Sequence, residues 1–203
     1  MANTQARKRS AAIAFLVCCA SFLVPASPAA AYGAGAVSWP VGLSGQYCLG
    51  STATAHTSWP GYISTAVTQY NNITGYPRPY WSRSCGPGYQ INIHVSSLPV
   101  GLCGATSHTP PQTGTLTSAD ISYTTRYGYV RGVPGTATSC NFDYVTTHEF
   151  GHSQGMPHGC VASAVMYGYD KGISVLTSDD KYSHRWLYDP NFIGPPSPDS
   201  SCA

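Results

Sequence analysis

The sequence has few charged residues, and it contains a single glutamate. Asp, Glu, Lys and Arg together make up 9% of the 203 residues, and Glu149 is the one glutamate among eight acidic residues. A chain this poor in charge has no basic patch of the kind that nucleic acid or anionic lipid would require. We therefore expect neither a nucleic-acid nor a membrane partner, and little selection of any ligand by its charge.

No segment after the first 31 residues is apolar enough to cross a membrane, because a spanning helix needs about 20 apolar residues. The first 31 residues instead have the three parts of an export signal. Basic residues at positions 7–9 precede an apolar run, Ala11–Val24, and Ala29–Ala31 offers a small-residue cleavage site. A transmembrane anchor is the alternative, but the run is short and ends at Pro25.

Removal of a signal peptide spanning residues 1–31 changes the charge of the chain. Three of the ten Lys and Arg residues would go and all eight acidic residues would stay, so seven minus eight leaves a net charge of −1. The remaining 172 residues, 203 minus 31, fit one domain with its own core. We expect residues 32–203 to form a single secreted domain and a monomer.

The mature region has no Cys-x-x-Cys pair, which argues against a zinc ion held by thiolates. It has an even number of cysteines, which in an exported protein indicates three disulfides. Their connectivity cannot be read from the sequence. The expected disulfide cysteines are Cys48, Cys85, Cys103, Cys140, Cys160 and Cys202.

Hydrophobic spacing predicts both strands and helices in the first two thirds of the mature region. Apolar residues recur at helical spacing from Thr57 to Ile73, whereas Tyr89–Val95 alternates like a half-buried strand. We expect further strands near Gln46–Leu49, Gly101–Ser107 and Ile121–Thr125. This mixture predicts an α+β fold.

Two more helices are expected in the last third. One runs from Phe142 to Gln154, with Asn141 or Ser139 as its N-cap. The other runs from Ser178 to Tyr188, with Ser178 as a candidate cap and acidic residues in its first turn, where they suit the helix dipole. The segment between them is expected to be a loop, and the proline-rich tail after residue 190 should be irregular.

The segment HEFGHSQGMPH, residues 148–158, predicts a metal site. His148 and His152 are four residues apart, so on a helix both side chains project from one face. Gly155 lets the backbone turn after the helix and Pro157 stiffens that exit, so His158 can return as a third nitrogen ligand. Three neutral imidazoles with an open fourth position are the ligand set of a catalytic zinc.

Glu149 follows the first ligand, where its carboxylate can face a zinc-bound water. Zinc lowers the pKa of that water to about 7, and Glu149 could take its proton and pass it to a leaving amine. Surface histidines on an ordinary helix are the alternative. Gly155 and His158 also stand at the spacing that a third ligand requires. A chance match of the whole pattern is improbable in a chain with seven histidines and one glutamate. We predict hydrolysis of peptide bonds.

The pattern H-E-x-x-H-x-x-G-x-x-H resembles the metzincin metallopeptidases, and HEFGHSQGMPH most resembles the matrix metalloproteinases. Ala164–Tyr167 lies at the distance after His158 where their methionine turn is found. The resemblance implies an α+β metzincin-like catalytic domain with a mixed twisted sheet, an active-site helix, a methionine turn and a C-terminal helix. It implies that Met166 forms a hydrophobic floor beneath the zinc ligands, the alternative being an ordinary core methionine.

A second stretch, LTSDDKYSHRWLY at Leu176–Tyr188, is similar to the closing helix of the matrix metalloproteinases. In that family the aspartates bond to the methionine-turn region and to the mature N-terminus. The resemblance implies the same structural role for Asp179 and Asp180, with simple helix-start charges as the alternative. The specific matches cover residues 148–188.

The sequence also departs from the family pattern. Gly168 stands where astacins and serralysins have a tyrosine ligand, so no tyrosine switch is expected. No acidic residue lies between Asp120 and Asp143, so the additional zinc and calcium sites of matrix metalloproteinases should be missing, although a calcium site built partly from carbonyls stays open. Arg83–Pro87 is faintly similar to their latency segment, but a disulfide is the favoured role for Cys85.

Metzincins bind substrate along an edge strand above the zinc, through backbone hydrogen bonds. The resemblance implies that Gly101–Ser107 is this strand, with Gly104 and Ala105 allowing close approach. Tyr167 and Tyr169 would wall an apolar pocket of modest depth for the residue after the cleaved bond. The expected partner is a protein or peptide substrate.

Three hypotheses therefore stand for the function. The first is a secreted zinc endopeptidase, with one catalytic zinc held by His148, His152 and His158. The second is a zinc hydrolase of a non-peptide amide, which would use the same residues. The third is an exported binding protein that keeps the fold and its zinc without catalysis. The retention of Glu149 favours an enzyme, because a binding protein could lose this residue freely.

Overall fold

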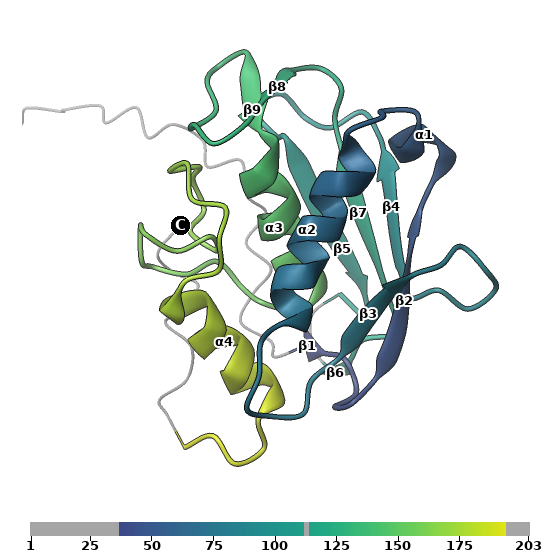
Figure 1. Cartoon of the computed structure of the whole chain (residues 1–203), viewed down its shortest axis with the longest axis vertical. Helices are drawn as coiled ribbons and strands as arrows, with labels where there is room; N and C mark the ends of the chain where they lie inside the picture. The colour runs from purple at the N-terminus through teal and green to yellow at the C-terminus, as the bar shows by residue number, and fades with distance from the viewer. Residues whose placement is uncertain (1–36, 112–113, 194–203) are drawn as a thin grey trace, which may run out of the picture.

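The computed structural model describes residues 37–111 and 114–193 (Figure 1). The expected signal peptide, Cys202 and most of the expected irregular tail lie outside these residues. Within the described ranges, no helix has both the length and the apolar character needed to cross a membrane.

The main sheet has five strands in the order β3-β2-β4-β7-β5. All neighbouring strands are parallel except the last pair, in which β5 runs antiparallel to β7. The mixed sheet of an α+β fold is thereby confirmed, and β5 forms one of its two edges. In this order the strands are β3 (Tyr80–Arg83), β2 (Ser44–Leu49), β4 (Ile91–Val95), β7 (Ser118–Tyr123) and β5 (Gly104–Thr109).

Helices α2 (Trp59–Asn71) and α3 (Phe142–Ser153) lie next to each other against the sheet, and α4 (Ser178–Tyr188) lies beyond them (Figure 1). Helix α3 contacts α2 on one side and strands β5 and β7 on another. The short helix α1 (Ser51–Thr54) contacts β4. The helical part of the predicted metal-binding segment therefore lies between the edge of the sheet and a second helix.

Two small two-stranded ladders complete the fold. Strand β1 (Val37–Ser38) pairs with β6 (Gly114–Thr115), and β8 (Gly128–Val130) pairs with β9 (Ser139–Asn141). Strand β9 ends where α3 begins, so this ladder fixes the entry of the chain into the active-site helix.

The core lies between the sheet and the two central helices. Alternate residues of β4 and β7 are buried because successive side chains of a strand point to opposite faces, and the buried side chains of α2 recur at helical spacing. Phe142, the first residue of α3, is fully buried, with its ring centroid 4.6 Å from that of Trp59. The buried residues of these elements are Ile91, Ile93, Ala119, Ile121, Tyr123, Trp59, Ile63, Ala66, Val67 and Tyr70.

Disulfides are present, as expected. Cys48 bonds to Cys85, and Cys103 bonds to Cys140. Cys160 is also disulfide-bonded. The Cys103–Cys140 bond ties the residue before β5 to the strand that leads into α3, so it links the two elements that carry the site. Cys85 therefore forms a disulfide, which is the role that the sequence analysis favoured for it.

Several element boundaries differ from the sequence interpretation. Ser178 is the first helical residue of α4 and not its cap: the cap is Thr177, whose side chain accepts a hydrogen bond from the Asp180 N–H in a capping box. Asn141, and not Ser139, caps α3. The edge strand begins at Gly104 and not at residue 101. The strand expected over residues 121–125 is β7, which begins three residues earlier.

Candidate active site

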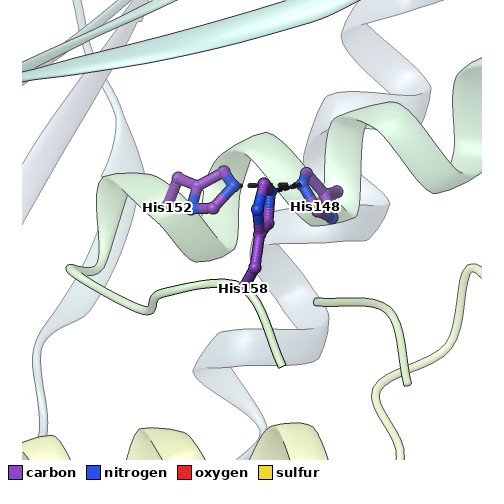
Figure 2. Close-up of side chains that lie close together, drawn as sticks. All are labelled: His148, His152 and His158. Carbon is purple, nitrogen blue, oxygen red and sulfur yellow. Dashed lines mark hydrogen bonds between the residues drawn. The ribbon is translucent and has the colours of Figure 1, made fainter. Parts of the chain in front are cut away.

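Three imidazoles converge on one point beside α3 (Figure 2). Nε2 of His148 lies 3.0 Å from Nε2 of His152 and 3.1 Å from Nε2 of His158. The first two side chains project from successive turns of α3, and the third returns from the segment that follows the helix. One ligand atom from each residue lies within 4.8 Å of the others. The structure therefore brings together the three predicted metal ligands.

Gly155 makes the return of His158 possible. Its φ is +85°, in the left-handed region that glycine favours. A Cβ built at this position would lie 2.0 Å from the carbonyl oxygen of Val37 in β1. The turn after α3 is thus packed directly against the backbone of the first described strand, with no room for a side chain.

The hydrogen bonds of Nδ1 in the two helical histidines determine which ring nitrogen carries the free lone pair. Nδ1 of His148 lies 2.7 Å from the Val165 carbonyl oxygen, and Nδ1 of His152 lies 2.8 Å from the Met156 carbonyl oxygen. A carbonyl only accepts, so each Nδ1 carries the proton, and each Nε2 presents a lone pair toward the other. Lone pairs that face one another repel unless a cation lies among them, so this donor set fits zinc.

Burial keeps these imidazoles neutral, as metal ligands must be. Burial, with the neighbouring His158 adding to it, lowers the pKa of His148 to about 3. The pKa of His152 lies well below its ordinary value, and that of His158 is also lowered, in both cases chiefly through burial.

Glu149 lies between α3 and β5 with 7% of its surface exposed. The hydroxyl of Thr106, in β5, lies 2.8 Å from Glu149 Oε2 and 3.0 Å from the Glu149 carbonyl oxygen. Burial raises the pKa of this carboxyl to about 7, against the opposing effect of the Thr106 hydrogen bond. A buried carboxyl that titrates near neutrality is a feature of groups that exchange protons.

Met166 packs against α3 at Gly151, the residue before the second helical histidine. A Cβ at Gly151 of α3 would lie 2.3 Å from Met166 Sδ, so the absence of a side chain there lets the methionine approach the helix. Tyr70 of α2 lies against the same place, donating from its hydroxyl to the Thr147 carbonyl oxygen at 3.0 Å. Met166 is 1% exposed. This position suits the floor role that the family resemblance implies.

The two aspartates of α4 differ in their surroundings. Asp180 is buried, and its carboxylate accepts hydrogen bonds from the N–H groups of Val165 at 3.0 Å and Met166 at 2.9 Å. Asp179 is half-buried, and its Oδ2 would be 3.3 Å from a Cβ at Gly159, next to His158. The expected contact with the mature N-terminus falls outside the described residues.

Of the expected substrate-binding residues, Gly104 faces Glu149. A Cβ at Gly104 would lie 2.7 Å from Glu149 Cγ. Ala105, the next residue of the strand, therefore points to the other face of the sheet. Within the described residues, β5 pairs with β7 alone, so its outer edge carries backbone groups open to another strand. Tyr167 and Tyr169 lie after the methionine turn with ring centroids 5.9 Å apart, and Tyr169 is 45% exposed.

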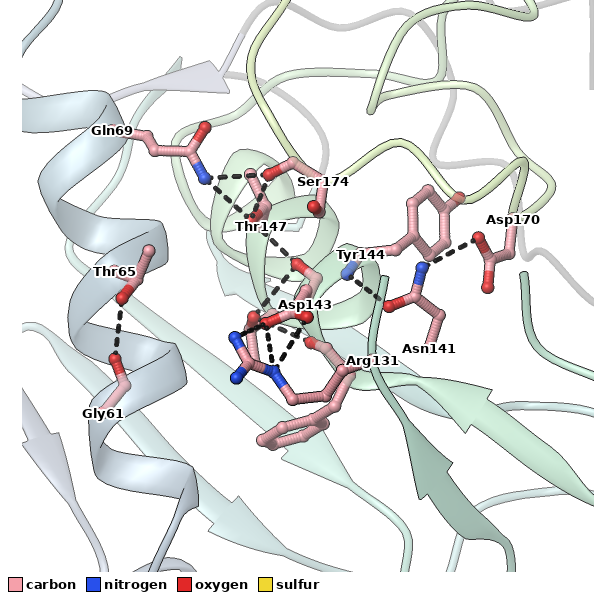
Figure 3. A network of polar contacts seen from close by, with 12 residues as sticks. Gly61, Thr65, Gln69, Arg131, Asn141, Asp143, Tyr144, Thr147, Asp170 and Ser174 are labelled. Carbon is pink, nitrogen blue, oxygen red and sulfur yellow. Dashed lines mark hydrogen bonds and ion pairs between the residues drawn. The ribbon is translucent and has the colours of Figure 1, made fainter. Parts of the chain in front are cut away.

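The loop after the methionine turn, residues 167–176, is anchored at several points that the sequence interpretation missed (Figure 3). The Tyr144 hydroxyl donates to the Tyr167 carbonyl oxygen at 2.7 Å. Asp170 accepts from the Gly135 N–H at 2.7 Å and from the Asn141 side-chain amide at 3.4 Å. No periodicity in the sequence indicates such loop contacts. Thr106, in contrast, could have been found, because it alternates with Gly104 on the predicted strand.

The class of protein that this fold and site define is the zinc metallopeptidase. The sequence model of the matrixin family matches residues 55–189, which is more than half of the chain, and the chain therefore belongs to the matrixin family. The resemblance to matrix metalloproteinases is thereby confirmed.

A curated relative is the hatching enzyme of Paracentrotus lividus, which is 43% identical over 60 residues. That match covers 28% of this chain and 10% of the relative, so the chain spans about a tenth of that protein's length. The match supports the family assignment. It is too short to transfer the activity of the whole relative to this chain.

Proposed function

We propose that this protein is a secreted zinc-dependent endopeptidase in which Glu149 is the general base. The observation that carries the proposal is the convergence of the Nε2 atoms of three histidines, together with a buried glutamate that directly follows the first of them on α3. His148, His152 and His158 would hold the metal. When bound, zinc supplies Lewis acidity that lowers the pKa of a coordinated water to about 7.

The role of Glu149 follows from its position next to the first proposed metal ligand. Its carboxylate takes a proton from the attacking water as the new C–O bond forms, and it returns that proton to the amine nitrogen as the C–N bond breaks. A carboxylate next to a metal ligand in the chain, buried and hydrogen-bonded to Thr106, can accept a proton from the water and release it again. No other group has to supply or remove a proton.

The substrate is proposed to lie extended beside β5. The outer edge of this strand can add one more strand through backbone hydrogen bonds. Backbone pairing accepts many sequences, so selection falls to the pockets, of which one would lie beside Tyr167 and Tyr169. Gly104 and Ala105, which carry little or no side chain, are proposed to let the substrate approach closely.

Secretion is proposed from the signal-like segment at residues 1–31 and from the disulfides, which form and persist in oxidising compartments. The protein is proposed to act as a monomer with residues 32–203 as its catalytic domain. No calcium site is included in the proposal.

The test compares the purified protein with its Glu149→Gln variant on a mixed peptide library, with zinc content measured for both. The wild type should cut internal peptide bonds. The variant should keep one zinc ion and lose activity by about a thousandfold, because general base catalysis contributes roughly that much.

The matched control is Asp143→Asn, also on α3, where the carboxylate pairs with the exposed Arg131 at 3.1 Å (Figure 3). This variant should retain activity. If the zinc-loaded wild type cuts no peptide, the endopeptidase proposal is rejected. Non-peptide amide substrates and binding partners would then be tested. A fully active Glu149→Gln variant would reject the general base.

A further inference from the structure

We propose that Thr106 is a positioning residue that, together with Gly104, fixes the carboxylate of Glu149. The edge strand proposed to bind substrate would then also set the position of the base. This inference rests on the proposed function, because it gives a role in catalysis to residues that touch Glu149.

Three alternate residues of β5 contact the helix α3, which carries Glu149. Gly104, Thr106 and His108 are alternate residues of the strand, so they share one face. Gly104 and Thr106 both meet Glu149, and Nε2 of His108 lies 2.6 Å from the carbonyl oxygen of His152. One strand face therefore contacts the base and the backbone of the second metal ligand.

The Thr106 hydroxyl holds one oxygen of the Glu149 carboxylate. Its Oγ1 lies 2.8 Å from Oε2 and 3.0 Å from the Glu149 carbonyl oxygen, and its one proton favours the nearer, charged acceptor. Thr106 itself is 7% exposed. A hydrogen bond to an ionised acceptor is roughly twice as strong as a neutral one, and at a buried site water cannot readily replace it. With Oε2 held in this way, Oε1 is the oxygen left to exchange the proton.

Gly104 leaves the space that the same side chain occupies. A Cβ at this position would lie 2.7 Å from Glu149 Cγ, 2.9 Å from Val145 Cγ1 and 3.0 Å from Glu149 Oε1. Gly104 is not among the glycines with positive φ, so the backbone does not demand glycine here. The missing side chain leaves this space to Glu149 and Val145, so a larger residue would displace one or both of these side chains.

These two contacts confine a side chain that otherwise has several rotamers. An unheld glutamate would spread over these rotamers and spend less time in the reactive geometry. Loss of the Thr106 hydroxyl should therefore slow the chemical step without weakening substrate binding. A structural role alone would instead lower stability or zinc content and leave the kcat of the folded, zinc-loaded enzyme unchanged.

The first test uses Thr106→Val, which keeps the shape and removes the hydroxyl, beside Thr106→Ser, which keeps the hydroxyl. The valine variant should lose about tenfold in kcat, the size expected for one hydrogen bond to a charged group. Its KM and zinc content should stay near those of the wild type, its melting temperature should fall by no more than a few degrees, and serine should restore most of kcat. Thr65→Val is the control, because the Thr65 hydroxyl bonds to the Gly61 carbonyl oxygen on the exposed side of α2 at 3.0 Å.

The second test does not need activity. Glu149 is the one glutamate in the sequence, so protein labelled with 13C at the glutamate carboxyl gives a single carboxyl resonance. Thr106→Val should move this resonance in both zinc-free and zinc-loaded protein, whereas Thr106→Ser and Thr65→Val should leave it in place.

The outcomes separate this inference from the proposed function. An unmoved resonance in Thr106→Val, unchanged kcat, a serine variant as slow as the valine variant, or loss of zinc from the valine variant would each overturn the positioning role. A wild type that cuts no peptide would reject the proposed function, and the resonance would still show whether Thr106 fixes Glu149.

Discussion

Asp180 and His148 are linked through the backbone of Val165, which forms a hydrogen bond with each of them. Asp180 Oδ2 accepts from the Val165 N–H at 3.0 Å, and the Val165 carbonyl oxygen accepts from His148 Nδ1 at 2.7 Å. One residue of the methionine turn thus joins the closing helix α4 to a proposed zinc ligand. Groups that orient metal ligands from behind in this way tune metal affinity.

The first prediction is that Asp180→Asn lowers both stability and zinc affinity. Asparagine turns an N–H group toward N–H donors, and it replaces a charged acceptor that also receives the Thr177 N–H at 2.8 Å. We expect the free energy of unfolding to fall by about 2 kcal/mol and zinc affinity to fall about tenfold. Chemical unfolding and competition with a chelator measure the two effects. Asp179→Asn is the matched control, and equal losses in both variants would contradict the role given to Asp180.

The second prediction concerns Gly155. Gly155→Ala should impair zinc binding, because the new Cβ would collide with the Val37 carbonyl and the turn that brings back His158 would have to move. Gly132 has a φ of +64° with nothing within 4 Å of its Cβ position, so Gly132→Ala measures the cost of the backbone conformation alone. That cost should be about 1 kcal/mol, and Gly155→Ala should exceed it. Equal unfolding free energies and zinc contents would show that the β1 contact is unimportant.

The third prediction concerns the stability of zinc-free protein at acid pH. Burial, aided by the charge of Arg78, lowers the pKa of His184 to about 3, and the three clustered histidines also have lowered pKa values. Lowered pKa values mean that the unfolded chain binds more protons. The stability that these histidines contribute is therefore fully present above pH 6.5, the ordinary histidine pKa, and it is lost as the pH drops toward 3. Glu149, with its pKa raised to about 7, works in the opposite direction between pH 4.5 and 7.

His184 offers a way to isolate one of these protons. It lies outside the metal cluster, and its Nδ1 is 2.8 Å from the Tyr76 hydroxyl. In His184→Gln, the fall of unfolding free energy between pH 6 and 4 should be shallower by up to about 1.4 kcal/mol per pH unit, the value for one proton. Urea unfolding in the presence of a chelator gives this slope. An unchanged slope would show that His184 takes up a proton in the folded protein.

The sequence predicts the parts of this protein that depend on local pattern. His148 and His152 follow from helical spacing, and His158 follows from the glycine that ends the helix. The strand over Tyr89–Val95 and the helix over Thr57–Ile73 follow from period, and the structure places them as β4 and α2 within a few residues. Each of these features is decided by residues close together in the chain.

Features that depend on distant residues were missed or misplaced. Strand β3 has four residues and just one buried position, Trp81, so its hydrophobic pattern is too weak to predict. Strands β8 and β9 form through pairing with each other, which no local pattern encodes. Thr177 caps α4 because Asp180 completes the capping box, and an adjacent serine offered an equally plausible cap. The partners of Glu149 also come from a strand more than 40 residues earlier.

The last prediction concerns the loop at residues 167–176, which is proposed to wall the pocket after the cleaved bond. Gln69 of α2 holds the end of this loop with both atoms of its amide. Its Nε2 donates to the Ser174 carbonyl oxygen at 2.8 Å (Figure 3), and its Oε1 accepts from the Leu176 N–H at 2.8 Å. The amide thus pairs with the loop as a neighbouring strand would. Its loss should let the pocket wall shift while the metal ligands stay in place.

Gln69→Leu should therefore broaden the preference for the residue after the cleaved bond and leave zinc content unchanged. Loss of about 1 kcal/mol of loop anchoring should reduce the ratio of kcat/KM between the best and an oversized residue roughly fivefold. The neighbouring Thr68→Val is the control, because the Thr68 hydroxyl bonds within α2 to the Ser64 carbonyl oxygen at 2.8 Å. A cleavage profile from the peptide library gives the ratio. If Gln69→Leu cuts with wild-type selectivity, this loop does not set the preference, and the residues that do must be sought elsewhere around the three histidines.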